Sequence, residues 1–465
     1  MLDPLTVQRL THTGAAGTFR AALDPSTSTP VPVSVQPEKK RVGAGNLTAL
    51  MFAAFVDMMG LLMIVPQLPF VATRLGAGGF VVGALVSSFS LAQLLSAPLW
   101  GRMSDRYGRR PVLLTALTAS VGAYLIFAWA SVPAAGADPT FYLLLLFLSR
   151  LVQGAGGGTV GVIQAYVADS TEPRDRARAL GWLSAATNLG VSIGPAIGSL
   201  GVSLWGQRAP GMMAALLCAV NIGFVWLYVR ESHDPTAHAS AAAPRCPREA
   251  TLAVLAHPGQ TAPRLIWIYA VAMGAFSGFT AVLALFLHAE FNVTEKTIFY
   301  FFTWNGALSV LVRALLLGKA VDCFGEARLA RIGQALLALG LGLLPFTGML
   351  RLPPFELFGA SIEPRHVALA LVVSLMPLGT AFTFPCVTGL LSQVISPRER
   401  GVMMGVQQSY GGAARVLFPL LAGWTFEHLG VGVPFWTSAL LVLGTLVLTF
   451  GISPRRESTA PAPAV

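Results

Sequence analysis

The sequence predicts an all-α polytopic membrane protein with twelve transmembrane helices in two pseudo-symmetric halves of six. Hydrophobic residues make up 54% of the 465 residues and charged residues only 11%, less than half the charged share of ordinary soluble domains. The apolar residues form runs of about 20, the length of a helix that crosses the hydrocarbon core of a bilayer. Motifs of the first half also recur in the second half.

Twelve apolar runs predict the individual spans. Unpaired backbone amides cannot face lipid, so each run is expected to be helical, and membrane helices tolerate the abundant Gly and Pro. A large soluble helical core is the alternative, but it would need far more polar surface. The expected spans are approximately residues 47–70, 79–100, 111–131, 141–167, 178–203, 210–230, 264–289, 296–317, 329–349, 365–394, 402–425 and 431–452.

The stretches outside the spans divide the chain. Residues 1–46 lack the apolar core of a signal peptide. Their Pro, Ser and Thr content predicts a disordered cytoplasmic tail, or an extension caused by a misassigned start codon. Residues 231–263 are polar and rich in Pro and Ala, which predicts a cytoplasmic linker between the six-helix halves 47–230 and 264–452. Residues 453–465 are expected to form a second cytoplasmic tail.

The basic residues predict the orientation. Of the 31 Lys and Arg residues, 21 lie directly before the first span or in later segments on the same side, and five lie in the opposite loops. Such a bias places both termini in the cytoplasm. The net charge of +10 therefore indicates topology and a lipid bilayer as the surroundings, with no nucleic-acid partner. We expect a multi-pass monomer in the plasma (cell inner) membrane.

A charge-rich segment, "GRMSDRYGRRP" at 101–111, recurs as "GKAVDCFGEAR" at 318, an offset of 217 residues. A second pair is "PRDRARALG" at 173 and "PRERGVMMG" at 397. Both pairs fall in equivalent loops of a six-plus-six arrangement. Repeats of this kind indicate a transporter whose site lies near the middle of the membrane, between the halves.

Over residues 47–452 the chain resembles the major facilitator superfamily, and within it the twelve-span drug:proton antiporters, nearest the tetracycline-efflux-like multidrug branch. The resemblance rests on "GRMSDRYGRRP", on "RLVQGAGGG" at 150–158 and on "GVSIGPAIG" at 190–198, with support from "DMMGLLMIVPQLP" at 57–69. It implies two six-helix halves that rock about a central cavity. Spans 3 and 9 lack the acids that tetracycline pumps carry there, which argues against tetracycline as the substrate.

The resemblance implies a conformational latch in loop 2–3. Asp105 would face the positive end of span 11, with Arg109 and Arg110 pairing nearby acids. A helix N-terminus attracts an anion by about 0.3–1 kcal/mol, and by up to ~2 kcal/mol when partly buried. Gly101 and Gly108 would permit a tight turn and a close helix approach.

The second copy of this motif keeps the acid but loses the arginines. Asp322 matches the first acid, whereas Glu326 and Ala327 stand where the first copy has Arg109 and Arg110. We therefore expect the first half to carry the stronger latch.

Asp57 is the one acid of span 1, about ten residues in and so roughly 15 Å deep. A charge there costs about 2.5–3.5 kcal/mol, and the cost falls if the carboxylate can bind a proton. Asp57 is thus a predicted proton or substrate site, the alternative being a structural Asp paired with a neighbouring helix.

Arg150 shares a face of span 4 with Gln153, a candidate for the substrate cavity. An arginine does not shed its proton at ordinary pH, but it can hold a nearby carboxylate ionised. The resemblance implies a part for Arg150 in proton transfer. The alternative is an arginine that packs the helix and bonds backbone carbonyls.

Span 5 carries a stripe of small residues. Gly190, Gly194 and Gly198 recur every four residues and so line one side of the helix, which allows a close helix approach. Pro195 removes a helical hydrogen bond and bends the helix. Helix packing and a kinked seal against leakage are compatible roles for this motif.

Further cavity candidates come from the second half. Gln408 and Arg415 share a face of span 11, where contact with substrate or latch competes with packing. Asn305 shares a face of span 8 with Arg313, which is expected to snorkel to the interface because Gly318 lies only five residues on.

The sequence predicts a transporter. It lacks the G-x-x-x-x-G-K-[ST] motif of ATP-driven systems, and it shows no arrangement typical of a metal, a cofactor or an enzyme nucleophile. We expect proton-coupled efflux of small lipophilic or amphipathic organic compounds by alternating access. A uniporter or symporter of a sugar or other metabolite on the same fold is the alternative, and a non-transporting receptor or scaffold is a third reading.

Overall fold

The computed structural model describes residues 44–157, 160–171, 175–229, 231, 247–350, 353–357, 360–396 and 399–450. All of them belong to a single unit, Val42–Val465. The predicted tails, apart from the first residues of the first helix, and the middle of the predicted linker lie outside this set.

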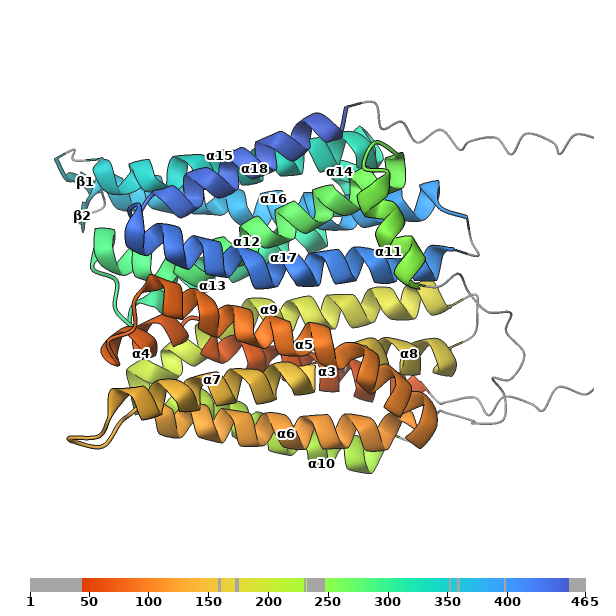
Figure 1. The fold of residues 1–465 in the computed structure, drawn as a ribbon. Coiled ribbons are helices and arrows are strands. Elements are labelled where there is room, and N and C mark those ends of the chain that lie inside the picture. Colours follow the sequence, from red (N-terminus) through yellow and green to blue (C-terminus); the bar gives the residue numbers. More distant parts are fainter. Residues whose placement is uncertain are drawn as a thin grey trace, which may run out of the picture. The chain divides into compact units, whose positions relative to one another are not determined.

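In the described residues of the first half, helices are the only regular secondary structure, and Figure 1 shows them side by side. Arg109–Ala130 begins directly after Gly108, and the longest helix of this half has 30 residues. The helices are α3 (Ala44–Ile64), α4 (Leu68–Arg74), α5 (Gly79–Tyr107), α6 (Arg109–Ala130), α7 (Pro139–Gly156), α8 (Val160–Ser170), α9 (Arg176–Trp205) and α10 (Ala209–Tyr228).

The second half repeats this arrangement after a short linker helix, α11 (Pro247–Ala256). A π-helical turn, Val312–Leu316, interrupts one of its helices, and the antiparallel hairpin of β1 (Phe355–Leu357) and β2 (Ala360–Ile362) joins two others. The helices are α12 (Thr261–Phe291), α13 (Ile298–Leu311), α14 (Leu317–Phe324), α15 (Glu326–Met349), α16 (Pro364–Val394), α17 (Arg400–His428) and α18 (Val433–Leu448).

Eight segments of the described residues are long and apolar enough to cross a membrane. They coincide with eight of the predicted spans. The other four predicted spans are also helical, as α9, α13 with α14, α17 and α18, but α18 has only 16 residues. The helical polytopic fold is therefore confirmed, with one short β-hairpin added, and the count of twelve membrane crossings stays a prediction.

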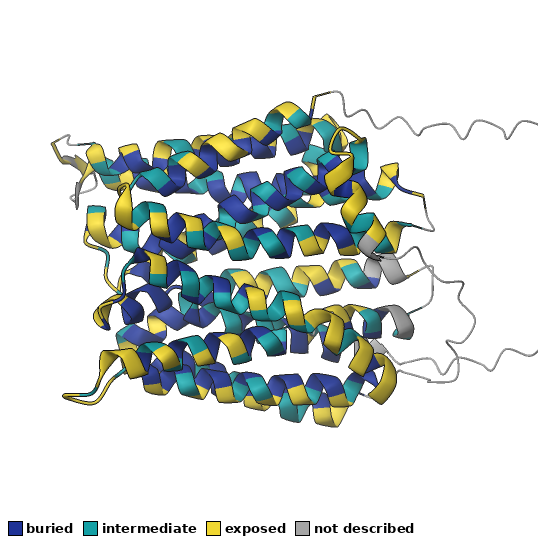
Figure 2. Ribbon diagram, viewed as in Figure 1, coloured by how far each residue is buried: buried dark blue, intermediate teal, exposed yellow. Residues whose placement is uncertain are grey.

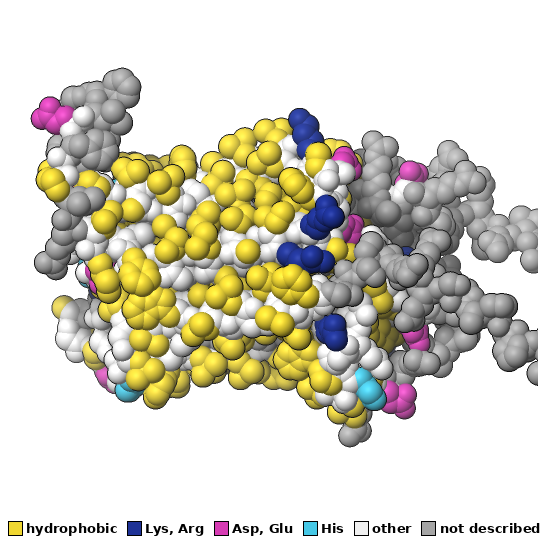
Figure 3. Space-filling view, turned by 90° about the horizontal axis from the view of Figure 1, so that it is seen from above, with side chains coloured by type: hydrophobic (Ala, Val, Ile, Leu, Met, Phe, Trp, Pro, Cys, Tyr) yellow, Lys and Arg dark blue, Asp and Glu magenta, His cyan; other side chains and the backbone are white. Residues whose placement is uncertain are grey.

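The side chains suit a lipid environment. Buried residues lie between helices and exposed residues lie on the outside of the bundle (Figure 2). Many of the exposed side chains are large and apolar, such as Leu204, Leu216 and Leu371. On the face shown in Figure 3, apolar side chains cover the middle and the Lys and Arg side chains gather toward one end.

Helix pairing follows the sequence repeat. Within the first half α3 packs on α9, and within the second half the equivalent α12 packs on α17. Between the halves α5 packs on α17, and the equivalent α13 packs on α9. The two cross-half contacts are thus related by the same pseudo-symmetry as the motifs.

Two elements differ from the predicted pattern. The predicted span 47–70 is broken at 65–67, because Pro66 and Pro69 cannot donate helical hydrogen bonds, and α4 begins at Leu68. Part of the predicted linker is the helix α11, which packs on α12 and α17. Its Val254 is fully buried and its Thr251 carbonyl accepts a hydrogen bond from the Tyr410 hydroxyl.

Candidate functional site

A pocket opens among helices of the first half, and Asp57 contributes to its wall. Asp57 lies midway along α3 and is half-buried. Within the described part of the chain, no hydrogen bond or ion pair involves its carboxylate. The lining residues come from α3, α8 and α9 and are Ala54, Asp57, Met58, Ile163, Gln164, Leu183, Ser184, Thr187 and Asn188.

Asp57 and the predicted span 4 residues meet around a tyrosine of α6. The Tyr124 side chain lies close enough to Asp57, Arg150 and Gln153 to interact electrostatically with all three. Tyr124 also lies against α3, because a Cβ placed on Gly60 would be 3.5 Å from its hydroxyl oxygen. The structure therefore brings Asp57 and Arg150 to one site, although no described ion pair joins them.

Arg150 is 2% exposed and packs over the Phe127 ring at 5.6 Å. Its Nε and Nη2 atoms are buried, and no described residue accepts a hydrogen bond from them. A buried guanidinium with unused donors favours a negative charge nearby. Arg150 therefore has unused donors beside Tyr124, a residue that also lies near Asp57.

The pocket also reaches the second half through Asn188. The Arg313 guanidinium, from the π-helical turn, donates a hydrogen bond to the Asn188 side-chain oxygen. From the sequence we expected Arg313 to snorkel to the interface, whereas in the structure its guanidinium bonds to α9 of the other half.

The three predicted cavity residues of the second half do not form a single cluster. Asn305 is half-buried on α13, and its buried amide nitrogen has no described hydrogen-bond partner. Gln408 on α17 is exposed and donates to the Tyr269 hydroxyl at 3.2 Å. Arg415, two turns along α17, also lies near Tyr269.

The loop between α5 and α6 turns at glycine, as does its repeat. Gly108 has φ +99° and the equivalent Gly325 has φ +74°, a region that disfavours residues with a Cβ. Gly101 plays no packing role here, because a Cβ at this position would meet nothing within 4 Å.

Charged side chains of this loop pair within the first half. Asp105 accepts a hydrogen bond from Arg109 Nη1 at 2.6 Å, and its side chain is 64% exposed. Glu231 accepts hydrogen bonds from the backbone amides of Arg109 and Arg110 at 2.9 and 3.0 Å, so a carboxylate stabilises the N-terminus of α6. In the second half Asp322 is exposed and has no described ion pair.

The glycine stripe of α9 lies against the backbone of α3. A Cβ on Gly190, Gly194 or Gly198 would collide with the carbonyl oxygens of Phe55, Met59 and Met63, respectively. Pro195 lies inside α9 on the same stretch. The opposing face of α9 reaches α13, because a Cβ on Gly306 would collide with the Ser192 carbonyl.

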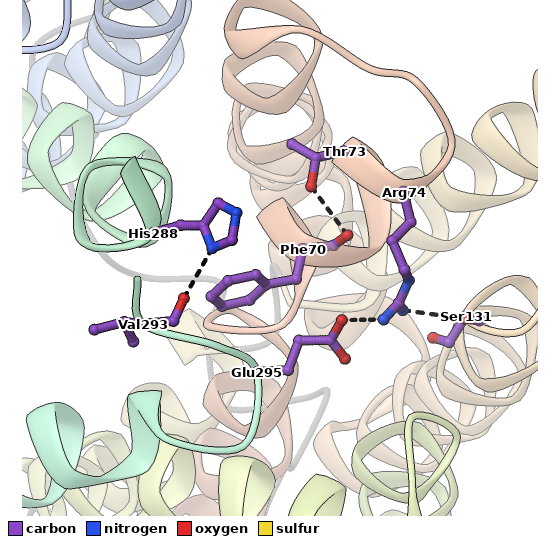
Figure 4. A network of polar contacts seen from close by, with 7 residues as sticks. All are labelled: Phe70, Thr73, Arg74, Ser131, His288, Val293 and Glu295. Carbon is purple, nitrogen blue, oxygen red and sulfur yellow. Dashed lines mark hydrogen bonds and ion pairs between the residues drawn. The ribbon is translucent and has the colours of Figure 1, made fainter. Parts of the chain in front are cut away.

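We call the end of the bundle with the 101–111 loop the motif end, and the opposite end, with α4 and the β-hairpin, the α4 end (Figure 1). Close contacts between the halves lie at the α4 end. The Arg74 guanidinium pairs with Glu295, and the Phe70 ring meets the His288 ring edge-on at 6.2 Å (Figure 4).

Toward the motif end the same helices lie apart. On α5, Pro98 and Leu99 are exposed, and no atom would touch a Cβ on Gly101, Gly401 or Gly405. The described residues thus form a bundle closed between its halves at the α4 end and open at the motif end.

Several residues of this site were not predicted from the sequence, namely Tyr124, Tyr269, Asn188 and Glu231. Tyrosine in an apolar run resembles an ordinary packing residue, so only its neighbours reveal its role. Asn188 carried a signal that could have been used, because an amide within a span needs a polar partner.

The fold and the site define a membrane transporter, with two related helical halves and a pocket in the first half whose wall includes Asp57. Residues 50–355 and 265–464 match the profile of the Major Facilitator Superfamily. The chain belongs to this superfamily, whose members are transporters and not enzymes.

Its relatives include drug-resistance proteins. The class B tetracycline resistance protein of Escherichia coli is 26% identical over 87% of this chain and 95% of its own length. Multidrug resistance protein 2 of Bacillus subtilis (strain 168) is 26% identical over 87% of this chain and 94% of its own length. The crystal structure of the human organic anion transporter MFSD10 matches with a TM-score of 0.61 at 24% identity, covering 89% of this chain and all of that one.

Proposed function

We propose that this protein exports small lipophilic or amphipathic organic compounds in exchange for protons by alternating access. The observation that carries the proposal is the carboxylate of Asp57, which lines a pocket midway along α3 and has no described partner. A protonatable acid in contact with the pocket can lose its proton when substrate binds and regain it when substrate leaves. The names of the tetracycline and multidrug resistance relatives support efflux of this substrate class.

The pocket has a volume of about 130 Å³, below the usual range for drug-sized ligands, so it holds only part of such a molecule. Its wall combines apolar side chains with a few polar groups, such as Gln164, Ser184 and Asn188. This composition favours ligands that are mainly apolar with one or two polar groups.

The packing of α5 on α17 supports the latch role of Asp105. Gly79 lies against Gly423, Gly83 against Pro419, and the Ser87 hydroxyl donates to the Val416 carbonyl at 2.6 Å. The two helices are antiparallel, so this register continues toward the motif end. If α5 and α17 pack together along this register as far as the motif end, Gly101 lies opposite Gly401 and Asp105 lies opposite the start of α17.

In the open arrangement of the motif end, Asp105 pairs with Arg109 instead. The acid therefore has a partner in each state, one in its own loop and one at a helix terminus of the other half. Because Asp105 exchanges one partner for the other, closing of the motif end is reversible.

The proposal also covers the membrane, the orientation and the oligomeric state of the protein. The 21 to 5 distribution of basic residues supports an inner-membrane protein with the motif end and both termini in the cytoplasm. We further propose that residues 231–263 link two six-helix halves that move as bodies, and that the protein acts as a monomer.

The test is uphill transport by Asp57→Asn in inverted membrane vesicles. Asn imitates the protonated acid permanently, so substrate accumulation driven by a proton gradient should be lost, while substrate counterflow in unenergised vesicles persists. Asp138→Asn removes an exposed acid outside the pocket, and this control should keep both activities. Full uphill pumping by Asp57→Asn would place the proton site elsewhere, and wild-type transport that ignores the proton gradient would favour a uniporter.

A further inference from the structure

The middle of the described bundle carries an excess of positive charge. Arg150, Arg313 and Arg415 lie well inside their helices, whereas Asp57 is the one acid found there among the residues whose side chains are described. An unpaired charge at this depth is costly and commonly marks a substrate or ion pathway. Arg150 belongs to the Asp57 site and Arg313 bonds to Asn188, which leaves Arg415.

Arg415 lies on the side of α17 that faces away from lipid. Leu417 and Leu421 mark the outer side of this helix, since both are more than half exposed. With about 100° of rotation per residue, Arg415 projects from nearly the opposite side. It is half-buried, and no hydrogen bond or ion pair is described for its guanidinium.

The hydroxyl group of Tyr269, a neighbour of Arg415, is a second hydrogen-bond donor at this place. A Cβ on Gly411 would be 2.7 Å from Cε1 of Tyr269, so the absence of a side chain lets the tyrosine ring pack closely against α17. Gln408 Nε2 donates to the Tyr269 hydroxyl oxygen at 3.2 Å. The tyrosine hydrogen is then free to point at another acceptor.

We propose that Arg415 and Tyr269, with Gln408 holding the tyrosine, form a subsite for an anionic group of the substrate, such as a carboxylate or sulfonate. A guanidinium and a hydroxyl donor together match such a group, because hydrogen bonds to an ionised acceptor are roughly twice as strong as neutral ones. The inference rests on the proposed export function and assigns the substrate class for it.

This assignment has a consequence for the driving force. Exporting a monovalent anion while one proton enters moves two positive charges inward. Exchange of a monovalent cation for a proton moves none. Export of an anionic substrate therefore depends on the membrane potential as well as on the pH gradient, and it slows when valinomycin and potassium abolish the potential.

Binding of three matched dyes tests the subsite in the purified full-length protein. Dansyl acid is anionic, dansyl amide is neutral and dansylcadaverine is cationic, and all share one fluorescent ring system. We expect the wild type to bind dansyl acid at least tenfold more tightly than dansylcadaverine. Arg415→Gln should lose at least tenfold affinity for dansyl acid and little for dansyl amide, while Arg415→Lys recovers part of the loss.

Arg331→Gln serves as the matched control, since Arg331 lies near the start of α15 and packs over the Phe450 ring. Removal of this arginine should leave all three affinities unchanged. Equal binding of the three dyes, or an equal loss by Arg415→Gln for all three, would overturn the anion subsite. If dansylcadaverine is nevertheless pumped uphill by a proton gradient, the export function holds and only the substrate class is wrong.

Discussion

The Glu427 carboxylate at the end of α17 accepts a hydrogen bond from the Phe80 backbone amide at 2.9 Å, at the start of α5 in the other half. An anion at a helix N-terminus is stabilised by the unpaired amides there. The proposed latch of Asp105 would use the same contact in reverse, from the end of α5 to the start of α17. The antiparallel pair α5 and α17 thus has an acid at each end.

Removing the charge of Glu427 should weaken closure of the α4 end. In a Cys-free background, Ser87→Cys places a thiol in the buried α5–α17 contact, where an impermeant maleimide reaches it only if this end opens. We expect Glu427→Gln to speed labelling from the α4 side about two- to fivefold, equivalent to about 0.3–1 kcal/mol. Glu363→Gln, whose acid pairs within its own half with Arg365, should have no effect, and equal rates for both variants would refute the role of Glu427.

Removing the charge of Asp105 should impair closure of the motif end. Asp105→Asn keeps the shape of the side chain, so we expect normal insertion but efflux reduced at least tenfold, a loss of roughly 1.4 kcal/mol. Asp322→Asn should cost less, because no paired arginines follow it. Near-normal efflux by well-expressed Asp105→Asn would contradict the latch role and leave this loop with a role in topology alone.

The stability of the α3–α9 contact should depend on glycine. In Gly194→Ala the added Cβ meets the Met59 carbonyl, and overpacking of this kind costs about 1–3 kcal/mol. The apparent melting temperature in detergent should therefore fall. In Gly181→Ala, on the same helix, the added Cβ meets nothing within 4 Å, so the melting temperature should stay the same or rise. Equal shifts of the melting temperature in the two variants would contradict the packing role.

Cysteine accessibility checks the orientation. In the Cys-free background, Ser240→Cys and Ala460→Cys should resist impermeant thiol reagents in intact cells, because the positive-inside bias places both stretches in the cytoplasm. Ala135→Cys, in the exposed loop between α6 and α7, should be labelled. Labelling of position 240 or 460 from outside would reverse the assignment.

The helices were predictable because length and hydropathy decide helix formation in lipid. The turns at Gly108 and Gly325 were also accessible from the motif repeat. Contacts between helices were not, since they depend on how each helix is rotated about its axis. Tyr124 therefore remained one aromatic residue among many, although it lies near both Asp57 and Arg150.

The partner of Arg313 could not be predicted for a related reason. Its expected position at the interface followed from Gly318, where the apolar run ends. In the structure its guanidinium bonds to Asn188 on α9, a contact that depends on how the two helices face each other.

The π-helical turn Val312–Leu316 has a consequence for how this helix can move. A π-turn holds one residue more than an α-helical turn, and one residue corresponds to about 100° of rotation. The turn therefore cannot relax by small angles. If it reverts to α-helix or shifts by one position, the residues on one side of it, Arg313 among them, exchange their facing partners together. Contact between Arg313 and Asn188 would then be made or lost as a discrete step, because this side of the helix turns as a unit.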